Sequence, residues 1–155
     1  MKKKFIVKMK QFSLKKHSSI PRDDLFQISI DIENFSSVMP EYFKSLSIVE
    51  ESGKEKLVDE KISFLGKMVT VKSKHVIIPP NIHEVHILTG PLKGTIFIEK
   101  YDESDDGTDI QIDISLFLNG LVRFIPFLQN IIVSRMESVF TEFLTCAEKF
   151  LKNPS

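Results

Sequence analysis

The chain has 155 residues, 42% of them hydrophobic, which is enough for one domain over residues 1–155 to bury roughly two thirds of its unfolded surface. Basic and acidic residues both number 21, so no overall charge attracts nucleic acid or an anionic membrane, and we expect no nucleic-acid partner. A single cysteine excludes an internal disulfide, which suits a cytoplasmic protein.

The N-terminal segment predicts the first strand. Phe5, Val7 and Met9 share one face, and the apolar positions then change phase to Phe12 and Leu14, which predicts a β-bulge near residues 10 and 11. Lysines recur through the segment, so it has no apolar region typical of a signal peptide.

Two short helices are predicted next. Pro21 suits the first helical position, and Asp23 and Asp24 suit the positive end of the helix dipole. Residues 31–43 indicate a second short helix or a pair of turns that ends near Val38.

Residues 45–118 alternate with a period of two between turn signals, which predicts six consecutive antiparallel strands. The last strand is the clearest, with isoleucine or leucine at every second position from 110 to 118, so one of its faces is buried. The expected strands are 45–53, 56–65, 67–78, 82–89, 94–102 and 108–118.

A long helix is expected over residues 119–152, and Pro126 should start or kink it. Residues 121–133 are apolar on nearly every side of this helix. They are too few, and too interrupted by Arg123 and Gln129, to span a membrane.

The order of these elements resembles the helix-grip fold of the START, Bet v 1 and polyketide-cyclase superfamily. Four segments are similar to parts of that fold: residues 19–26 to its first helix, 34–40 to its second, 88–94 to a glycine-proline turn, and 116–150 to the gripping helix of the coenzyme Q-binding and polyketide-cyclase branches. The resemblance implies an α+β protein in which a curved seven-stranded antiparallel sheet wraps around the C-terminal helix, in the order β-α-α-β6-α.

Such a fold leaves room for a cavity between sheet and helix, although a filled core is the alternative. The apolar helix start would then pack on the sheet, roof the cavity and be covered by the short helices near Phe35, Val38 and Met39. An empty dry pocket of about 300 Å³ would cost roughly 7 kcal/mol, so we expect water, lipid or a ligand inside it.

We therefore expect the protein to bind or transport a hydrophobic small molecule, such as a lipid, quinone, isoprenoid or aromatic compound. Ser73, His75 or Tyr101 would orient it, while the alternation in residues 82–102 allows either face to be the inner one. The predicted ligand-binding residues are Phe64, Val69, Val71, Ser73, His75, Val85, Ile87, Phe97, Tyr101, Leu128, Ile132 and Met136.

Two other functions stay open. A cyclase or aromatase-like enzyme would use His75 as acid or base, but we assign no second inward titratable group to act with it. The third is an interaction module, in which the apolar helix start docks onto a protein partner. We expect no cofactor.

Four further patterns are interpreted as structural. The histidines of residues 82–86 point to opposite faces of a strand, which leaves only a surface pair, Glu84 and His86, and no predicted metal site. Residues 102–109 partly mimic a calcium loop but predict a hairpin turn. Cys146 is expected to be a buried, inert thiol. The lysines at positions 2–4, 8, 10, 15 and 16 are offset by surface acids, among which we place Glu60.

Overall fold

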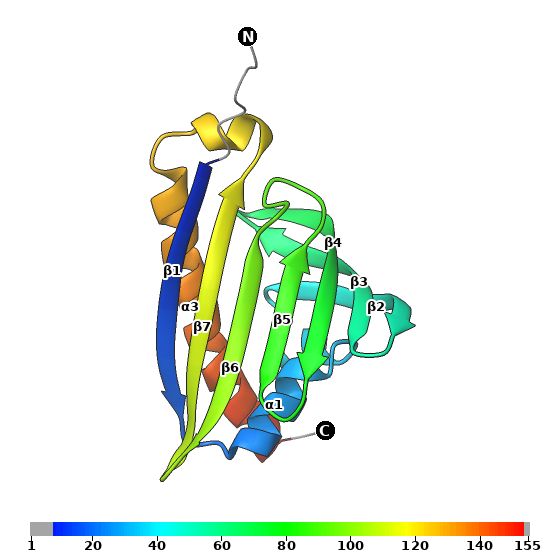
Figure 1. Cartoon of the computed structure of the whole chain (residues 1–155), viewed down its shortest axis with the longest axis vertical. Helices are drawn as coiled ribbons and strands as arrows, with labels where there is room; N and C mark the ends of the chain where they lie inside the picture. The colour runs from blue at the N-terminus through cyan, green and yellow to red at the C-terminus, as the bar shows by residue number, and fades with distance from the viewer. Residues whose placement is uncertain (1–7, 154–155) are drawn as a thin grey trace.

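The computed structural model describes residues 8–153, which form one seven-stranded antiparallel sheet and three α-helices (Figure 1). The strand order across the sheet is β1-β7-β6-β5-β4-β3-β2. The elements are β1 (Lys8–Ser18), α1 (Arg22–Ile30), α2 (Phe35–Val38), β2 (Phe43–Ser52), β3 (Glu55–Phe64), β4 (Lys67–Ile78), β5 (Ile82–Ile87), β6 (Ile96–Ser104), β7 (Gly107–Leu118), the 3₁₀ helix η1 (Gly120–Phe124) and α3 (Leu128–Lys152).

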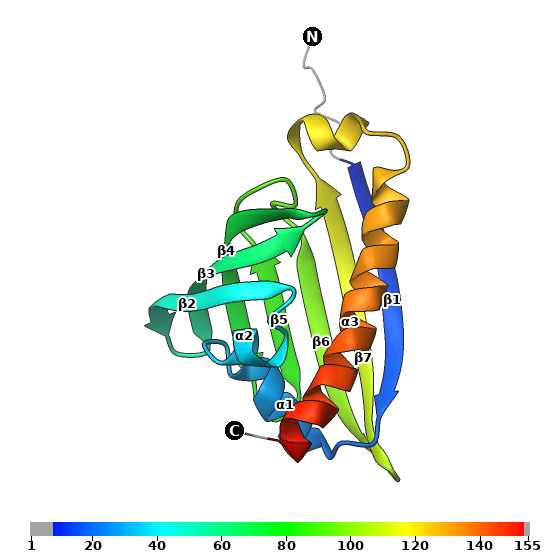
Figure 2. The same ribbon diagram turned by 180° about the vertical axis from the view of Figure 1, so that it is seen from behind.

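The sheet curves around α3, which runs along β1, β7 and β6 on the concave side (Figure 2). The strands β2 to β5 bend away from α3, and α1 and α2 lie between the two arms at one end (Figure 2). This arrangement confirms the predicted α+β class and the β-α-α-β6-α order. Each of the six strands after α2 begins and ends within two residues of its predicted bounds, because alternation and turn residues mark strand ends well.

The predicted β-bulge in β1 is wrong. Its pairing with β7 runs without a shift from Lys8 opposite Leu118 to Ser18 opposite Thr108. Met9 is exposed, and Phe5 and Val7 lie outside the described residues. The phase was misread because lysines occupy inward positions of this edge strand. The amino group of Lys16, for example, reaches past the sheet edge to within 3.5 Å of the Glu137 carboxylate on α3.

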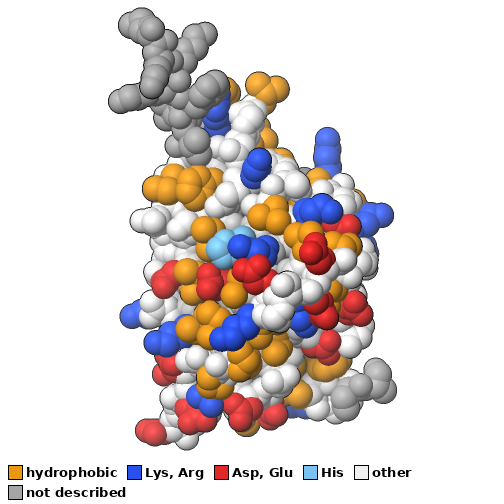
Figure 3. All heavy atoms as spheres, turned by 45° about the vertical axis from the view of Figure 1, so that its right-hand side comes forward, with side chains coloured by type: hydrophobic (Ala, Val, Ile, Leu, Met, Phe, Trp, Pro, Cys, Tyr) orange, Lys and Arg blue, Asp and Glu red, His pale blue; other side chains and the backbone are white. Residues whose placement is uncertain are grey.

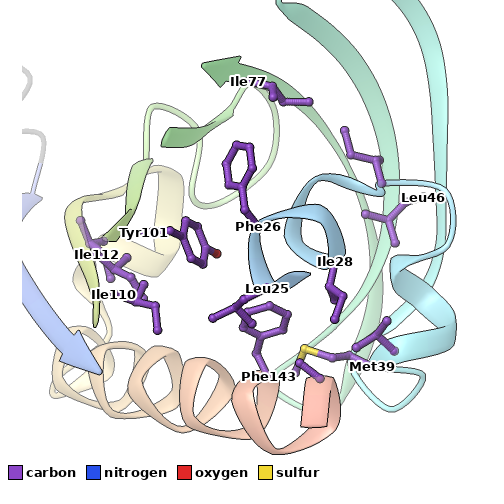
Figure 4. Close-up of a cluster of buried hydrophobic side chains, with 14 of the residues drawn as sticks. Leu25, Phe26, Ile28, Met39, Leu46, Ile77, Tyr101, Ile110, Ile112 and Phe143 are labelled. Atoms are coloured by element: carbon purple, nitrogen blue, oxygen red, sulfur yellow. The ribbon is translucent and has the colours of Figure 1, made fainter. Parts of the chain in front are cut away.

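The helix α1 fills the closed end of the fold. The first turn carries Asp23 and Asp24, as predicted, whereas Pro21 is the N-cap and lies one residue before the helix instead of at its first position. Leu25 and Phe26 are almost completely buried and point toward the sheet and α3 (Figure 4). The Phe26 ring meets the ring of Tyr101 on β6 edge-on, with 5.7 Å between centroids. The hydrophobic core therefore fills this end, and it continues along β7 and α3 to Leu118 and Leu128.

The predicted helix over residues 119–152 is divided in two. Residues Gly120–Phe124 form a 3₁₀ helix, the chain turns at Ile125, and α3 begins only at Leu128. Pro126 causes the break, because its ring disfavours helical geometry at the preceding residue and Ile125 is extended, with ψ 118°. At 25 residues α3 is about 37 Å long, shorter than a helix over the whole segment would be.

The expectation that the apolar segment before α3 packs on three sides is also wrong. Leu121, Phe124 and Phe127 are 85%, 68% and 76% exposed. Only from Leu128 and Ile132 onward does the segment bury side chains in the core. The apolar surface of residues 121–127 faces outward, at the end of the molecule opposite to α1 (Figure 1).

The hairpin between β6 and β7 gives a test of the closed end. A Cβ atom at Gly107, whose φ is +151°, would coincide with the backbone carbonyl oxygen of Ser18. Gly107→Ala should therefore lower the free energy of unfolding by about 2–4 kcal/mol in urea titrations. Gly53→Ala is the control, because Gly53 also has positive φ but its Cβ would meet nothing within 4 Å. The free energy of unfolding of this control should fall by only about 1 kcal/mol. Equal losses in the two variants would contradict the close approach of Gly107 to Ser18.

Candidate functional site

A cavity of about 240 Å³ lies between the curved sheet and α3. The strands β3 to β6 form one wall, the middle of α3 forms the opposite wall, and α1 with the α2 region closes one end. Leu65 lines the cavity and is nonetheless exposed, so the cavity reaches the surface beside the β3–β4 turn. The sheet therefore curves around α3 and leaves an unfilled space between the two.

Most of the predicted ligand-binding residues line this cavity. Three of them do not: Leu128 and Tyr101 pack in the core, and Ser73 is fully buried beside the cavity. Those in the wall are Phe64, Val69, Val71, His75, Val85, Ile87, Phe97, Ile132 and Met136. Whether any of them binds a ligand stays a prediction.

Four titratable side chains interrupt the apolar wall, and we call Glu60, His75, His83 and Glu99 the polar cluster. His75 Nε2 lies 2.7 Å from Glu60 Oε1, and His75 Nδ1 lies 2.8 Å from His83 Nε2. His83 Nδ1 lies 3.6 Å from Glu99 Oε1. The polar cluster is therefore a continuous row across β3, β4, β5 and β6.

Two buried hydroxyl groups on the same inner face of the sheet complete the row. Ser73 Oγ donates to Glu60 Oε1 at 2.9 Å, and the Tyr101 hydroxyl donates to Glu99 Oε1 at 2.6 Å. Both carboxylates thus accept a hydrogen bond that holds them in place. The polar cluster faces the inner part of the cavity, toward α1, because its residues lie several positions along each strand from the loops at the open end.

The hydrogen-bond pattern restricts where the protons are. If Glu60 is ionised, His75 Nε2 carries a hydrogen, so His75 Nδ1 accepts one from His83 Nε2. In two neutral imidazoles His83 Nδ1 then has a lone pair directed at the Glu99 carboxylate. It is also the one buried side-chain nitrogen or oxygen without a hydrogen-bond partner among the described residues. One additional proton, or a ligand between His83 and Glu99, satisfies this position.

The pKa values of the Glu99 carboxyl and the Tyr101 phenol shift in opposite directions. Burial raises the pKa of the Glu99 carboxyl, but the nearby His83, the hydrogen bond from Tyr101 and the more distant His75 outweigh it, so the net pKa is lowered. Burial, together with the adjacent Glu99 carboxylate, raises the pKa of the Tyr101 phenol well above 10. Glu99 is thus kept ionised and Tyr101 protonated.

Sequence reasoning missed Glu60, His83 and Glu99, and placed Glu60 on the surface. The signal was present, because side chains two residues apart share a face of a strand. Taking Val85 and Ile87 as inward also places His83 inward. Likewise, an inward Phe97 places Glu99 inward, and an inward Phe64 places Glu60 inward. What the sequence lacks is the strand pairing and register that bring these side chains on β3, β5 and β6 together with His75 on β4.

The remaining motifs lie outside the cavity. His86 and Glu84 form a pair at 3.2 Å on the other face of β5 from His83. Residues 102–109 form the β6–β7 hairpin, as predicted. Cys146 is half-buried on α3, where burial and the nearby Glu142 raise the pKa of its thiol. Within residues 8–153 no helix is long and apolar enough to cross a membrane.

Comparison with known proteins finds similarity in structure but not in sequence. No family model and no curated protein matches the chain. The Zhui aromatase/cyclase from Streptomyces sp. R1128 superimposes with a TM-score of 0.79 at 13% identity, covering 96% of this chain and 99% of the other. Ara h 8.0201 superimposes at 0.74 with 19% identity, covering 94% and 100%. Norcoclaurine synthase from Thalictrum flavum superimposes at 0.70 with 12% identity, covering 96% and 90%.

This chain has the Bet v 1-like helix-grip fold. The resemblance inferred from the order of elements is confirmed at the level of the fold, over nearly the full length of each of these chains. In this helix-grip fold the gripping helix is α3, and the cavity occupies the space between grip and helix.

The position of Tyr101 in the helix-grip core gives a test of the site's electrostatics. Tyr42→Phe leaves Tyr101 as the only tyrosine, so ultraviolet absorbance reports its phenolate alone. Phenolate should form only well above pH 10, because burial and Glu99 disfavour it. A raised pKa stabilises the folded state below pH 10 and loses this contribution as the pH rises further. In the variant that carries both Tyr42→Phe and Tyr101→Phe, the melting temperature should therefore fall less steeply above pH 10. Ionisation of folded Tyr101 near pH 10 would contradict the geometry.

Proposed function

We propose that this protein binds and carries a hydrophobic small molecule whose polar group faces the polar cluster, and that residues 1–155 form one domain for this purpose. The supporting observation is an apolar cavity of about 240 Å³ with buried hydrogen-bonding groups gathered in its inner part. Small-molecule sites combine an apolar wall with a few placed polar groups in this way.

The size of the cavity supports an occupant. A dry cavity of 240 Å³ would cost roughly 6 kcal/mol, which is comparable to the stability of a small domain. Its wall is built of large apolar side chains from both sheet and helix, such as Phe97 and Phe140, whose rings lie 6.1 Å apart. An apolar body of modest size, either aromatic or isoprenoid, suits this space.

The polar cluster supports a polar head on that body. His83 Nδ1 and Glu99 Oε1 are separated by 3.6 Å, too far for a hydrogen bond to each other. A hydroxyl group on the ligand donates to the Glu99 carboxylate and, when His83 Nδ1 carries a proton, accepts from His83; a carbonyl accepts from the same protonated nitrogen. The cluster lies deep in the cavity, so the ligand inserts its polar group first and leaves its apolar part toward the open end.

One similar structure supports an aromatic ligand. Norcoclaurine synthase is described in complex with dopamine and hydroxybenzaldehyde, both of which join an aromatic ring to hydroxyl groups. A ring of that kind matches the combination of apolar wall and hydroxyl-binding row in this cavity.

Native mass spectrometry of freshly purified protein tests the proposal. We expect a bound mass in a one-to-one ratio, released by organic solvent. Val85→Phe places an extra ring in the cavity and should lower occupancy at least about tenfold, with the melting temperature kept or raised. Val49→Phe is the matched control on an exposed position of β2 and should leave occupancy unchanged. Unliganded wild-type protein that also binds no aromatic or isoprenoid compound would contradict the carrier function.

A second candidate, an enzyme of the cyclase type, is favoured by the row of acids and bases in the cavity wall. Hydrogen bonds connect Glu60, His75 and His83, and with one additional proton they could pass a proton along these three groups; the 3.6 Å gap from His83 to Glu99 would be bridged by a substrate hydroxyl or carbonyl group. Such a row polarises a carbonyl and removes a proton from the carbon beside it.

Isotope exchange separates carrier from enzyme. The released compound is incubated in deuterium oxide with protein, and mass spectrometry follows deuterium at carbon. An enzyme should accelerate exchange, and Glu99→Gln should slow it about a hundredfold or more while the compound still binds. A carrier gives no exchange above buffer with either protein.

A further inference from the structure

Three loops meet at the end of the molecule opposite to α1 (Figures 1 and 2). They are the β3–β4 turn with the strand residues that flank it (64–68), residues 88–95 between β5 and β6, and residues 119–127 between β7 and α3, and together we call them the loop end. Hydrogen bonds connect the second loop to its neighbours. Asn119 donates to the carbonyl groups of Pro91 and Lys93, and the hydroxyl of Thr89 accepts from the backbone of Lys72.

The loop end exposes large apolar side chains from all three loops. Residues 119–127 contribute the most, because Leu121, Phe124 and Phe127 extend almost fully into solvent. The other loops contribute Leu65 and Leu88. Isolated exposed apolar residues are ordinary, but a concentration of them at one end marks an interaction surface.

The backbone at two of these tips supports a functional reason for the exposure. Leu65 and Phe127 are the non-glycine residues with positive φ in the described chain, at 50° and 63°. A left-handed backbone is unfavourable for bulky side chains, and neither side chain is buried in compensation. Their identity is therefore not explained by folding.

Charge distinguishes this end from the other. The three loops contain no acidic residue, and each carries one cation: Lys67, Lys93 and Arg123. At the opposite end the exposed carboxylates gather, on the first turn of α1 and on the β6–β7 hairpin. Figure 3 shows the same division on one face, with acidic side chains absent from its uppermost part.

The loop end is also continuous with the cavity. Leu65, Pro91 and Leu92, from two of the loops, line the cavity where it approaches the surface. Whatever covers the loop end therefore lies beside the cavity mouth.

We propose that the loop end docks onto the surface of an anionic lipid bilayer, with the apolar tips inserted below the headgroups and the acidic end directed away. The apolar side chains match the acyl boundary, and the three cations match the negative headgroups. A chain with zero formal net charge gains this orientation only from the separation of its charges. The docking does not depend on the identity of the cavity ligand, although it places the cavity mouth against lipid.

Co-sedimentation with lipid vesicles tests the docking. The full chain should bind vesicles of phosphatidylcholine with about 30% phosphatidylglycerol at low salt. It should bind pure phosphatidylcholine vesicles at least about tenfold less, and binding should weaken as salt is added.

The apolar contribution is tested with Leu121→Ser combined with Phe127→Asn. Asparagine tolerates positive φ better than phenylalanine, so folding should be kept, as the melting temperature reports. The partition onto anionic vesicles should fall at least about tenfold. Leu151→Ser, at an exposed but less protruding leucine near the far end of α3, is the control and should bind as the wild type does.

The charge contribution is tested with Lys67→Glu combined with Lys93→Glu. Partition should fall at least about thirtyfold, whereas Lys54→Glu, on the β2–β3 turn at the other end, should have little effect. Binding that is absent in the wild type, equal on neutral vesicles, or unchanged in both double variants overturns the proposal. A stable dimer that dissociates in the Leu121→Ser, Phe127→Asn variant, with no vesicle binding, overturns it in favour of a second copy of the chain.

Discussion

The packing of α1 between the sheet and α3 is the interaction on which the rest of the structure depends. Leu25 and Phe26 are buried between the two walls at one end, in one core cluster with Tyr101 of the sheet and Phe143 of α3 (Figure 4). Because α1 is nearly 10 Å wide, it keeps sheet and helix apart over the part of their length that it does not reach. The cavity is the space beyond it, bordered at that boundary by Ser29 and Ile32.

The polar cluster lies at this same boundary, between filled core and open cavity. Buried ion pairs add little net stability, because desolvation offsets the attraction, but a partner left alone is costly, by about 3–5 kcal/mol. The connected row from Ser73 to Tyr101 avoids lone partners at every position except His83 Nδ1. The one unsatisfied atom of the cluster, His83 Nδ1, is the position that the proposed ligand would satisfy.

The two ends of the molecule therefore have different physical characters. The α1 end is filled, acidic and closed by Gly107 against the backbone of Ser18, while the loop end is apolar, cationic and open to the cavity. Antiparallel pairing produces this division, because it brings alternate connections of the chain to the same end of the sheet. Turns distant in sequence thus form one surface.

The sequence by itself determined the class, the order of elements and the strand bounds, since these depend on local alternation and turn residues. Most of the residues it predicted as ligand-binding, His75 among them, do line the cavity, because an inner face follows from alternation along a strand. It misjudged β1, where Lys10 and Lys16 occupy inward positions at an edge, and residues 121–127, which are apolar yet exposed.

Only the tertiary structure decided that Glu60, His83 and Glu99 join His75, and that the apolar residues 121–127 face solvent. The physical reason is the same in both cases. Alternation states which side of a strand or helix is apolar, but strand register and the break at Pro126 decide what each side meets in space. The break itself has a local signal in Pro126, but strand register and the surroundings of the exposed segment are long-range relations, which no local pattern of residues contains.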